Sequence, residues 1–137
     1  MQLTKAELLE WASIYIKHRD LVLRRIKDIQ VKPDQLIVAY KDDTVEIVLA
    51  DPSMQNCQPV KEKTTFITIN TKPNLAILFQ NWKTYSQIKE LTIIFINPNS
   101  ELDTKWIIRP YIHSRICDEA SLKTGLKAMF ETVEALQ

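Results

Sequence analysis

The residues of this chain that are best suited to chemistry lie in one stretch, WIIRPYIHSRIC, which runs from Trp106 to Cys117. Read with a period of two, its arginines, its histidine and its tyrosine fall on one side, and mostly apolar side chains fall on the other. Guanidinium and imidazole groups on one side of a strand could bind phosphate or carboxylate groups, and a tyrosine ring would add a flat apolar contact. The pattern predicts a cationic strand face for an acidic or phosphorylated partner, formed by Lys105, Arg109, Tyr111, His113 and Arg115.

Pro110 interrupts this pattern and leaves its structure open. Because proline cannot donate a hydrogen bond to a neighbouring strand, the strand either lies at the edge of a sheet or ends near Arg109. In the second case residues 111–117 form a loop and the alternation is accidental. The plainer interpretation is a solvated sheet face followed by a loop into the last helix, because charged residues are mostly exposed.

Carboxylates around a predicted hairpin form a second group of candidates. Metal ions such as Mg²⁺ are bound by several oxygen ligands that converge, which makes Asp43, Glu46 and Asp51 the ligands of an alternative metal site. Such a site would serve a degenerate Mg²⁺-dependent hydrolase. The simpler interpretation is a pair of turn aspartates, Asp42 and Asp43, beside one exposed glutamate.

The sequence gives little support to other catalytic or cofactor sites. Cys57 and Cys117 show no C-x-x-C spacing, so we expect reduced thiols and neither a zinc site nor a disulfide. A dyad of His113 and Cys117 would have to be recognised by spatial geometry, and no motif supports it. The single glycine, Gly125, excludes glycine-rich phosphate loops. We therefore expect no cofactor and assign no catalytic residue.

Length and charge narrow the function classes further. The chain has 137 residues, 18 of them Lys or Arg and 17 Asp or Glu, so no global field attracts nucleic acid or an anionic membrane. Recognition by charge must be local. The longest apolar runs, such as LTIIFI, are far shorter than the roughly 20 residues of a membrane-spanning helix, and MQLTKAELLEW does not resemble a secretory signal. We expect one domain, no membrane partner and a cytoplasmic location.

Helical and strand patterns alternate along the chain. Thr4 and Glu7 fit a capping box, which predicts a helix that runs to about Asp28 or Ile29. Two more helices are predicted, one from Pro73 to about residue 89 and one capped by Asp118. Runs rich in β-branched residues predict five strands, over 35–41, 44–50, 64–70, 91–97 and 104–109.

These elements predict an α+β fold in the order α-β-β-β-α-β-β-α, with a single mainly antiparallel five-stranded sheet packed against three helices. The order, the length and the amphipathic ends LLEWASIYI and LKTGLKAMFETVEAL resemble the small chaperones of type III secretion. That resemblance implies a homodimer that holds an extended segment of another protein. The partial order α-β-β-β-α-β, with acidic residues on the second and third strands, resembles restriction-endonuclease-like nucleases and implies bound Mg²⁺.

The first predicted helix carries more apolar surface than docking on one sheet requires, because Ile14, Ile16, Leu21 and Leu23 lie off its main stripe. A partner chain could cover this excess. We therefore expect a non-catalytic protein-interaction or chaperone-like module that forms a homodimer. The alternative is a protein that binds nucleic acid or phosphate, with an affinity that falls steeply as salt is added. It would bind through Lys105, Arg109, Tyr111, His113 and Arg115.

Overall fold

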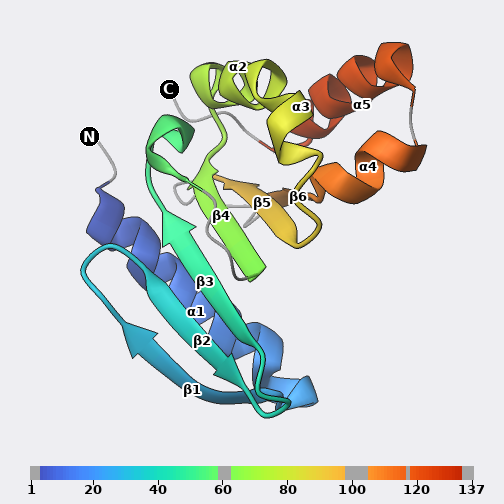
Figure 1. The fold of residues 1–137 in the computed structure, drawn as a ribbon. Helices are drawn as coiled ribbons and strands as arrows, with labels where there is room; N and C mark the ends of the chain where they lie inside the picture. Colours follow the sequence, from blue (N-terminus) through green and yellow to red (C-terminus); the bar gives the residue numbers. More distant parts are fainter. Residues whose placement is uncertain (1–3, 59–62, 98–104, 117, 134–137) are drawn as a thin grey trace.

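A twisted, mixed sheet of six strands runs through the computed structural model, in the order β1-β2-β3-β4-β5-β6 (Figure 1). The structure describes residues 4–58, 63–97, 105–116 and 118–133. Strands β3, β4 and β5 are parallel, and the remaining neighbours are antiparallel. The strands are β1 (Ile26–Val31), β2 (Leu36–Tyr40), β3 (Val45–Ala50), β4 (Lys63–Ile69), β5 (Leu91–Ile96) and β6 (Lys105–Ile108).

Helices cover both faces of this sheet and create two apolar cores (Figure 1). One face is covered by α1 (Lys5–Leu23), and the other by α2 (Lys72–Gln80), α3 (Trp82–Tyr85), α4 (Pro110–Ile116) and α5 (Glu119–Glu131), with the short 3-10 helix η1 (Met54–Asn56) beside them. Alternate residues of β5 point into different cores, Ile94 toward α1 and Phe95 toward the other helices. This explains why LTIIFI is apolar on both sides, as expected for a strand in the middle of the sheet.

The first helix begins as predicted but ends earlier. Thr4 caps it, since the backbone amide of Glu7 donates to the Thr4 hydroxyl at 3.1 Å. The prediction that it continues to Asp28 or Ile29 is wrong, because Arg24 adopts a left-handed conformation and β1 follows. A bulge after Ile26 shifts the register of β1, so that Ile26 and Ile29 both contact the core beneath α1. Their three-residue spacing imitated a helical period.

The α+β class is confirmed, but the order and pairing of the elements need correction. The predicted hairpin is present as antiparallel β2 and β3, with Asp43 in the left-handed conformation at the turn. The sheet is mixed rather than mainly antiparallel, because β4 returns parallel to β3. The described residues form six strands and five α-helices, an order that differs from the one on which the two resemblances depend.

The prediction that the strand after Lys105 continues as a cationic face is also wrong. Strand β6 ends at Ile108, and residues 110–116 form α4 rather than a strand or a loop. Pro110 occupies the first turn of this helix, where its missing N–H costs nothing. The backbone carbonyl of Arg109 accepts hydrogen bonds from the backbone amides of Ile112 and His113. The alternation of side chains beyond Arg109 was therefore accidental.

None of the helices in the part of the chain that the structure describes is both long enough and apolar enough to cross a membrane. The apolar residues are instead distributed between the two cores and a few exposed positions on α1, β1, β6 and α4. Ile16, one of the residues thought to widen the surface of α1, is buried, whereas Ile14, Leu21 and Leu23 are exposed. The excess apolar surface of α1 thus lies mostly in its second half.

The thiol of Cys57 lies in the core beneath α2, with only 3% of the residue exposed. Burial, together with the nearby charge of Asp51, raises the pKa of this thiol to about 12. A shift of this size lowers the thiolate fraction at neutral pH about a thousandfold. In a Cys117→Ser variant, we expect Cys57 to react with a thiol reagent at pH 7.5 only after unfolding in urea. Rapid labelling in native buffer would contradict the buried placement.

Candidate anion-binding site

A cavity of about 530 Å³ opens where the end of α1, the β2–β3 turn and the beginning of β4 meet the end of β6. We call it the arginine basin. Arg24 and Arg25 reach it because α1 ends at Leu23 and the chain turns back toward the sheet. Its cationic lining consists of Arg19, Arg24, Arg25, Lys41, Lys63 and Arg109.

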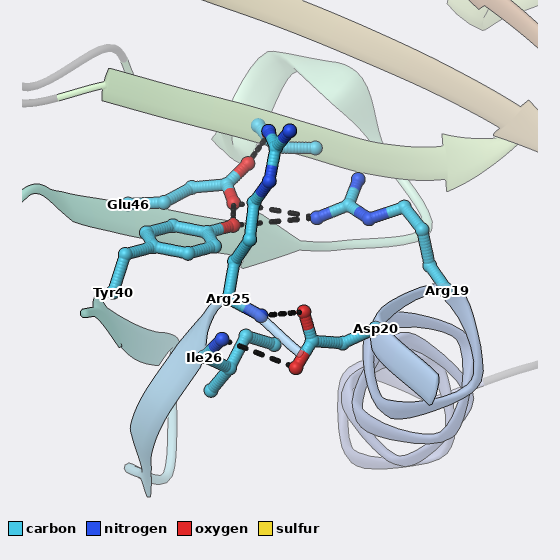
Figure 2. Close-up of polar contacts among 7 residues, drawn as sticks. Arg19, Asp20, Arg25, Ile26, Tyr40 and Glu46 are labelled. Carbon is cyan, nitrogen blue, oxygen red and sulfur yellow. Dashed lines mark hydrogen bonds and ion pairs between the residues drawn. The ribbon is translucent and has the colours of Figure 1, made fainter. Parts of the chain in front are cut away.

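Two carboxylates also line the basin, and both accept hydrogen bonds from their own loops. Asp20 accepts from the backbone amides of Arg25 at 2.8 Å and Ile26 at 3.1 Å, which fixes the turn after α1 (Figure 2). Asp42 accepts from the hydroxyl and the backbone amide of Thr44, and these bonds lower the pKa of the Asp42 carboxyl. Six cations against two carboxylates leave the lining with a surplus of positive charge.

A buried carboxylate holds the floor of the basin in place. Glu46 on β3 is only 2% exposed and accepts from the hydroxyls of Tyr40 and Thr65. The guanidinium of Arg19 lies 3.5 Å from the same carboxylate and 3.4 Å from the Tyr40 hydroxyl (Figure 2). Burial and the hydrogen bond to Glu46 raise the pKa of Tyr40, so this hydroxyl keeps its proton.

Among the cations that line the basin, Arg19 pairs with the Glu46 carboxylate and with the Tyr40 hydroxyl. Burial alone would lower its pKa, but the charge of Glu46 and the neighbouring tyrosines together raise the pKa above its usual value. Its charge is therefore permanent and its position is fixed. By contrast, Arg24, Arg25 and Arg109 are exposed, and no ion pair of theirs is found among the described residues. These three guanidinium groups are available to a ligand.

Only part of the predicted cationic face comes together. Arg109 lines the arginine basin, whereas Lys105 lies at the other end of β6, with its ammonium 5.0 Å from the ring centre of Tyr15. A ring nitrogen of His113 lies 3.1 Å from the backbone carbonyl of Arg109, within α4. Arg109 is thus the member of the predicted set that joins the largest group of cations.

Tyr111 and Arg115 line a separate, open cavity of about 530 Å³ beside α3 and α4, which we call the Tyr111 pocket. The guanidinium of Arg115 stacks on the Tyr111 ring, 3.5 Å from its centre. It also donates to the Tyr111 carbonyl at 2.9 Å, since the two residues are one helical turn apart. These two residues interact because α4 is a helix, not because they share a strand face.

The candidate metal ligands are not brought together. Asp43 lies in the exposed hairpin turn, and Glu46 lies five residues before Asp51, a separation of about 16 Å along a strand. Asp51 accepts from the backbone amide of Ser53 and the side chain of Asn56. No group of three or more His, Cys, Asp or Glu that could hold a metal ion exists within the described ranges. Cys117, the other half of the suggested dyad, lies outside those ranges.

Sequence reasoning missed most of the basin. Arg24 and Arg25 look like the solvated face of a longer helix, and Lys41 follows a strand that ends in an ordinary turn. Lys63 joins them only because β4 pairs in parallel with β3, opposite Glu46. One signal was available: the chain contains only five arginines, and two of them, Arg24 and Arg25, are adjacent.

Comparisons with protein-family models, with curated proteins and with solved structures find no match to this chain. The functional argument therefore depends on the site. All five arginines line either the arginine basin or the Tyr111 pocket, whereas the lysines are distributed more widely. Arginine is the side chain whose planar fork matches carboxylate and phosphate groups.

Proposed function

We propose that this chain is a non-catalytic binding module that holds an anionic group of a partner molecule in the arginine basin. The single observation that supports it most strongly is the presence of four of the five arginines, with Lys41 and Lys63, around one cavity. Guanidinium groups form bidentate, charge-assisted hydrogen bonds with carboxylates and phosphates. The ligand group is therefore a carboxylate or phosphate group, and charge complementarity holds it.

The chemistry of the lining favours binding over turnover. Among the described residues, no histidine or cysteine lines the basin. Arginine cannot act as a general base because it stays protonated. The Tyr40 and Thr44 hydroxyls already donate hydrogen bonds to carboxylates of the protein. The groups that remain free are donors, which suit recognition of an anion.

The surroundings of the basin favour a protein as the partner. Leu21, Val22 and Leu23 are exposed at the end of α1, and Leu23 also lines the basin. Apolar side chains next to a cationic cavity suit a protein surface that carries both acidic and apolar residues. The same exposed residues of α1 also support the proposal that a second copy of this chain binds there.

Inorganic pyrophosphate, titrated at low ionic strength, tests the basin without a known partner. We expect millimolar or tighter binding, and the double variant Arg24→Glu with Arg25→Glu should weaken it at least about tenfold, because about 1.4 kcal/mol of lost interaction gives that factor. The matched control is Lys72→Glu with Lys127→Glu, two exposed lysines on α2 and α5 outside the basin. Calorimetry or NMR shifts would measure both.

The proposal fails if the wild-type protein does not bind pyrophosphate, or if both double variants weaken binding equally. In the second case the loss would reflect net charge and not the basin. Salt provides a further check, since binding through several charge contacts should weaken as ionic strength rises. Circular dichroism of each variant would show that its fold is intact.

A further inference from the structure

Two more cavities continue the arginine basin along the same end of the sheet. Lys63 and Arg109 line both the basin and a cavity of about 170 Å³ that also includes Lys89 and Ile112, which we call the Lys89 pocket. Lys89 in turn lines the Tyr111 pocket as well. Because neighbouring cavities share lining residues, the three lie next to one another between the end of α1 and α4, and we call the row that they form the track.

The track crosses the strands instead of following one of them. It passes from the β2–β3 turn over the beginnings of β4 and β5 to the residue after β6, and it ends beside α4. Figure 1 shows the beginnings of β4 and β5 on the side of the sheet where α4 lies. Three interstrand spacings from β3 to β6 amount to about 14 Å, which an extended peptide covers in about four or five residues.

The lining combines cations with apolar side chains. Arg25, Lys89 and Arg115 are distributed along the track, and Glu90 is the carboxylate that lines its middle cavity. Leu23 is 57% exposed at one end, and Ile112 is 43% exposed in the middle. A ligand that matches this lining carries several negative charges with apolar groups among them.

Nucleic acid fits the track less well than a peptide does. Single strands bind proteins largely by stacking bases on open aromatic rings. The two tyrosine rings on the track already carry cations of the protein, Arg115 at 3.5 Å from the Tyr111 ring and Lys63 at 5.7 Å from the Tyr40 ring. The net charge of the whole chain is only +1, so no wider field draws in a polyanion.

We infer that the arginine basin, the Lys89 pocket and the Tyr111 pocket together form a docking track for an extended acidic peptide of a partner protein, with apolar side chains placed at Leu23 and Ile112. This inference rests on the proposed function and specifies its ligand. The acidic side chains pair with the exposed arginines and lysines. The peptide lies across the strand ends and reaches from α1 to α4.

The test uses a fluorescein-labelled peptide of four Glu-Glu-Leu repeats, with pyrophosphate and an oligothymidine of equal length as further probes. Lys89→Glu changes a residue that lines both distal cavities but not the basin. We expect it to weaken peptide binding at least about fivefold and to leave pyrophosphate binding unchanged. Arg115→Glu should act in the same direction, and Lys72→Glu should change neither.

The apolar part of the track has its own test. Leu23→Asn and Ile112→Asn should each weaken binding of the Glu-Glu-Leu peptide several-fold. A peptide of glutamate alone should bind both variants with the same affinity as it binds the wild type.

If Lys89→Glu leaves peptide binding unchanged while pyrophosphate still binds the basin, the track is refuted and the proposed function stands. If oligothymidine binds more tightly than the peptide and loses affinity in Lys89→Glu, the peptide assignment is refuted. If pyrophosphate itself does not bind, the proposed function has failed.

Discussion

Replacing Glu46 with alanine is expected to lower the free energy of unfolding by about 3 kcal/mol, because the change leaves buried donors without an acceptor. The hydroxyls of Thr65 and Tyr40 both donate to Glu46. Thr65 is itself buried, so its hydroxyl cannot turn to water. The ion pair with Arg19 contributes less, because the Arg19 side chain is 40% exposed and water replaces part of the attraction.

Urea unfolding followed by circular dichroism would measure this loss. Glu46→Gln retains one acceptor oxygen and the volume of the side chain, so it should cost less than Glu46→Ala. The same Gln variant removes a negative charge beneath the basin, and we expect pyrophosphate to bind it at least as tightly as the wild type. A Glu46→Ala variant as stable as the wild type would mean that the network does not hold the basin floor.

The parts of the fold that the sequence predicted correctly are those with local signals. The hairpin of β2 and β3 depends on a turn between two β-branched runs, and the helix caps at Thr4 and Asp118 depend on hydrogen bonds across three residues. The central placement of β5 followed from its apolar character on both faces. In each case a few neighbouring residues determine the conformation.

The errors arose where two local patterns coincide or where the pairing is distant. The bulge in β1 gives strand residues a helical spacing, and the side chains of α4 alternate as those of a strand would. The parallel pairing of β3 with β4 depends on a crossover through η1, for which no short motif exists. The sheet formed by the described residues therefore has six strands instead of the predicted five, and it is mixed.

The residues of the candidate site also differ in whether a local signal in the sequence identifies them. Arg109 was identified because it stands beside other basic residues in one stretch. Its actual neighbours in the basin, Arg25, Lys41 and Lys63, come from three other parts of the chain. They meet because α1 ends early, a hairpin turns beside it and β4 returns parallel to β3. No short motif predicts a cationic site that is formed by tertiary contacts of this kind. Only the positions of the arginines in the sequence point to it.

The Asn70→Ala variant is expected to lose about 3–5 kcal/mol of unfolding free energy, because one side chain makes three hydrogen bonds, two of them fully buried. Asn70 is fully buried directly after β4. Its amide donates to the backbone carbonyls of Phe130 at 3.1 Å and Val133 at 2.9 Å, and its oxygen accepts the indole N–H of Trp106 at 2.7 Å. Phe130 lies in the last turn of α5 and Val133 lies two residues beyond it, so this side chain ties the end of the helix to the sheet.

The matched control is Asn81→Ala, since the Asn81 amide also donates to a backbone carbonyl but is exposed. Urea unfolding monitored by tryptophan fluorescence should show a loss below about 1 kcal/mol for that control.

Asn70→Asp keeps the acceptor for Trp106 but directs a carboxylate oxygen at the two carbonyls. Protonation would restore a donor there, so the folded state raises the pKa of the new carboxyl, and stability should fall as the pH rises above about 4. A loss that did not depend on pH, or one equal to that of Asn81→Ala, would show that Asn70 does not tie α5 to the sheet.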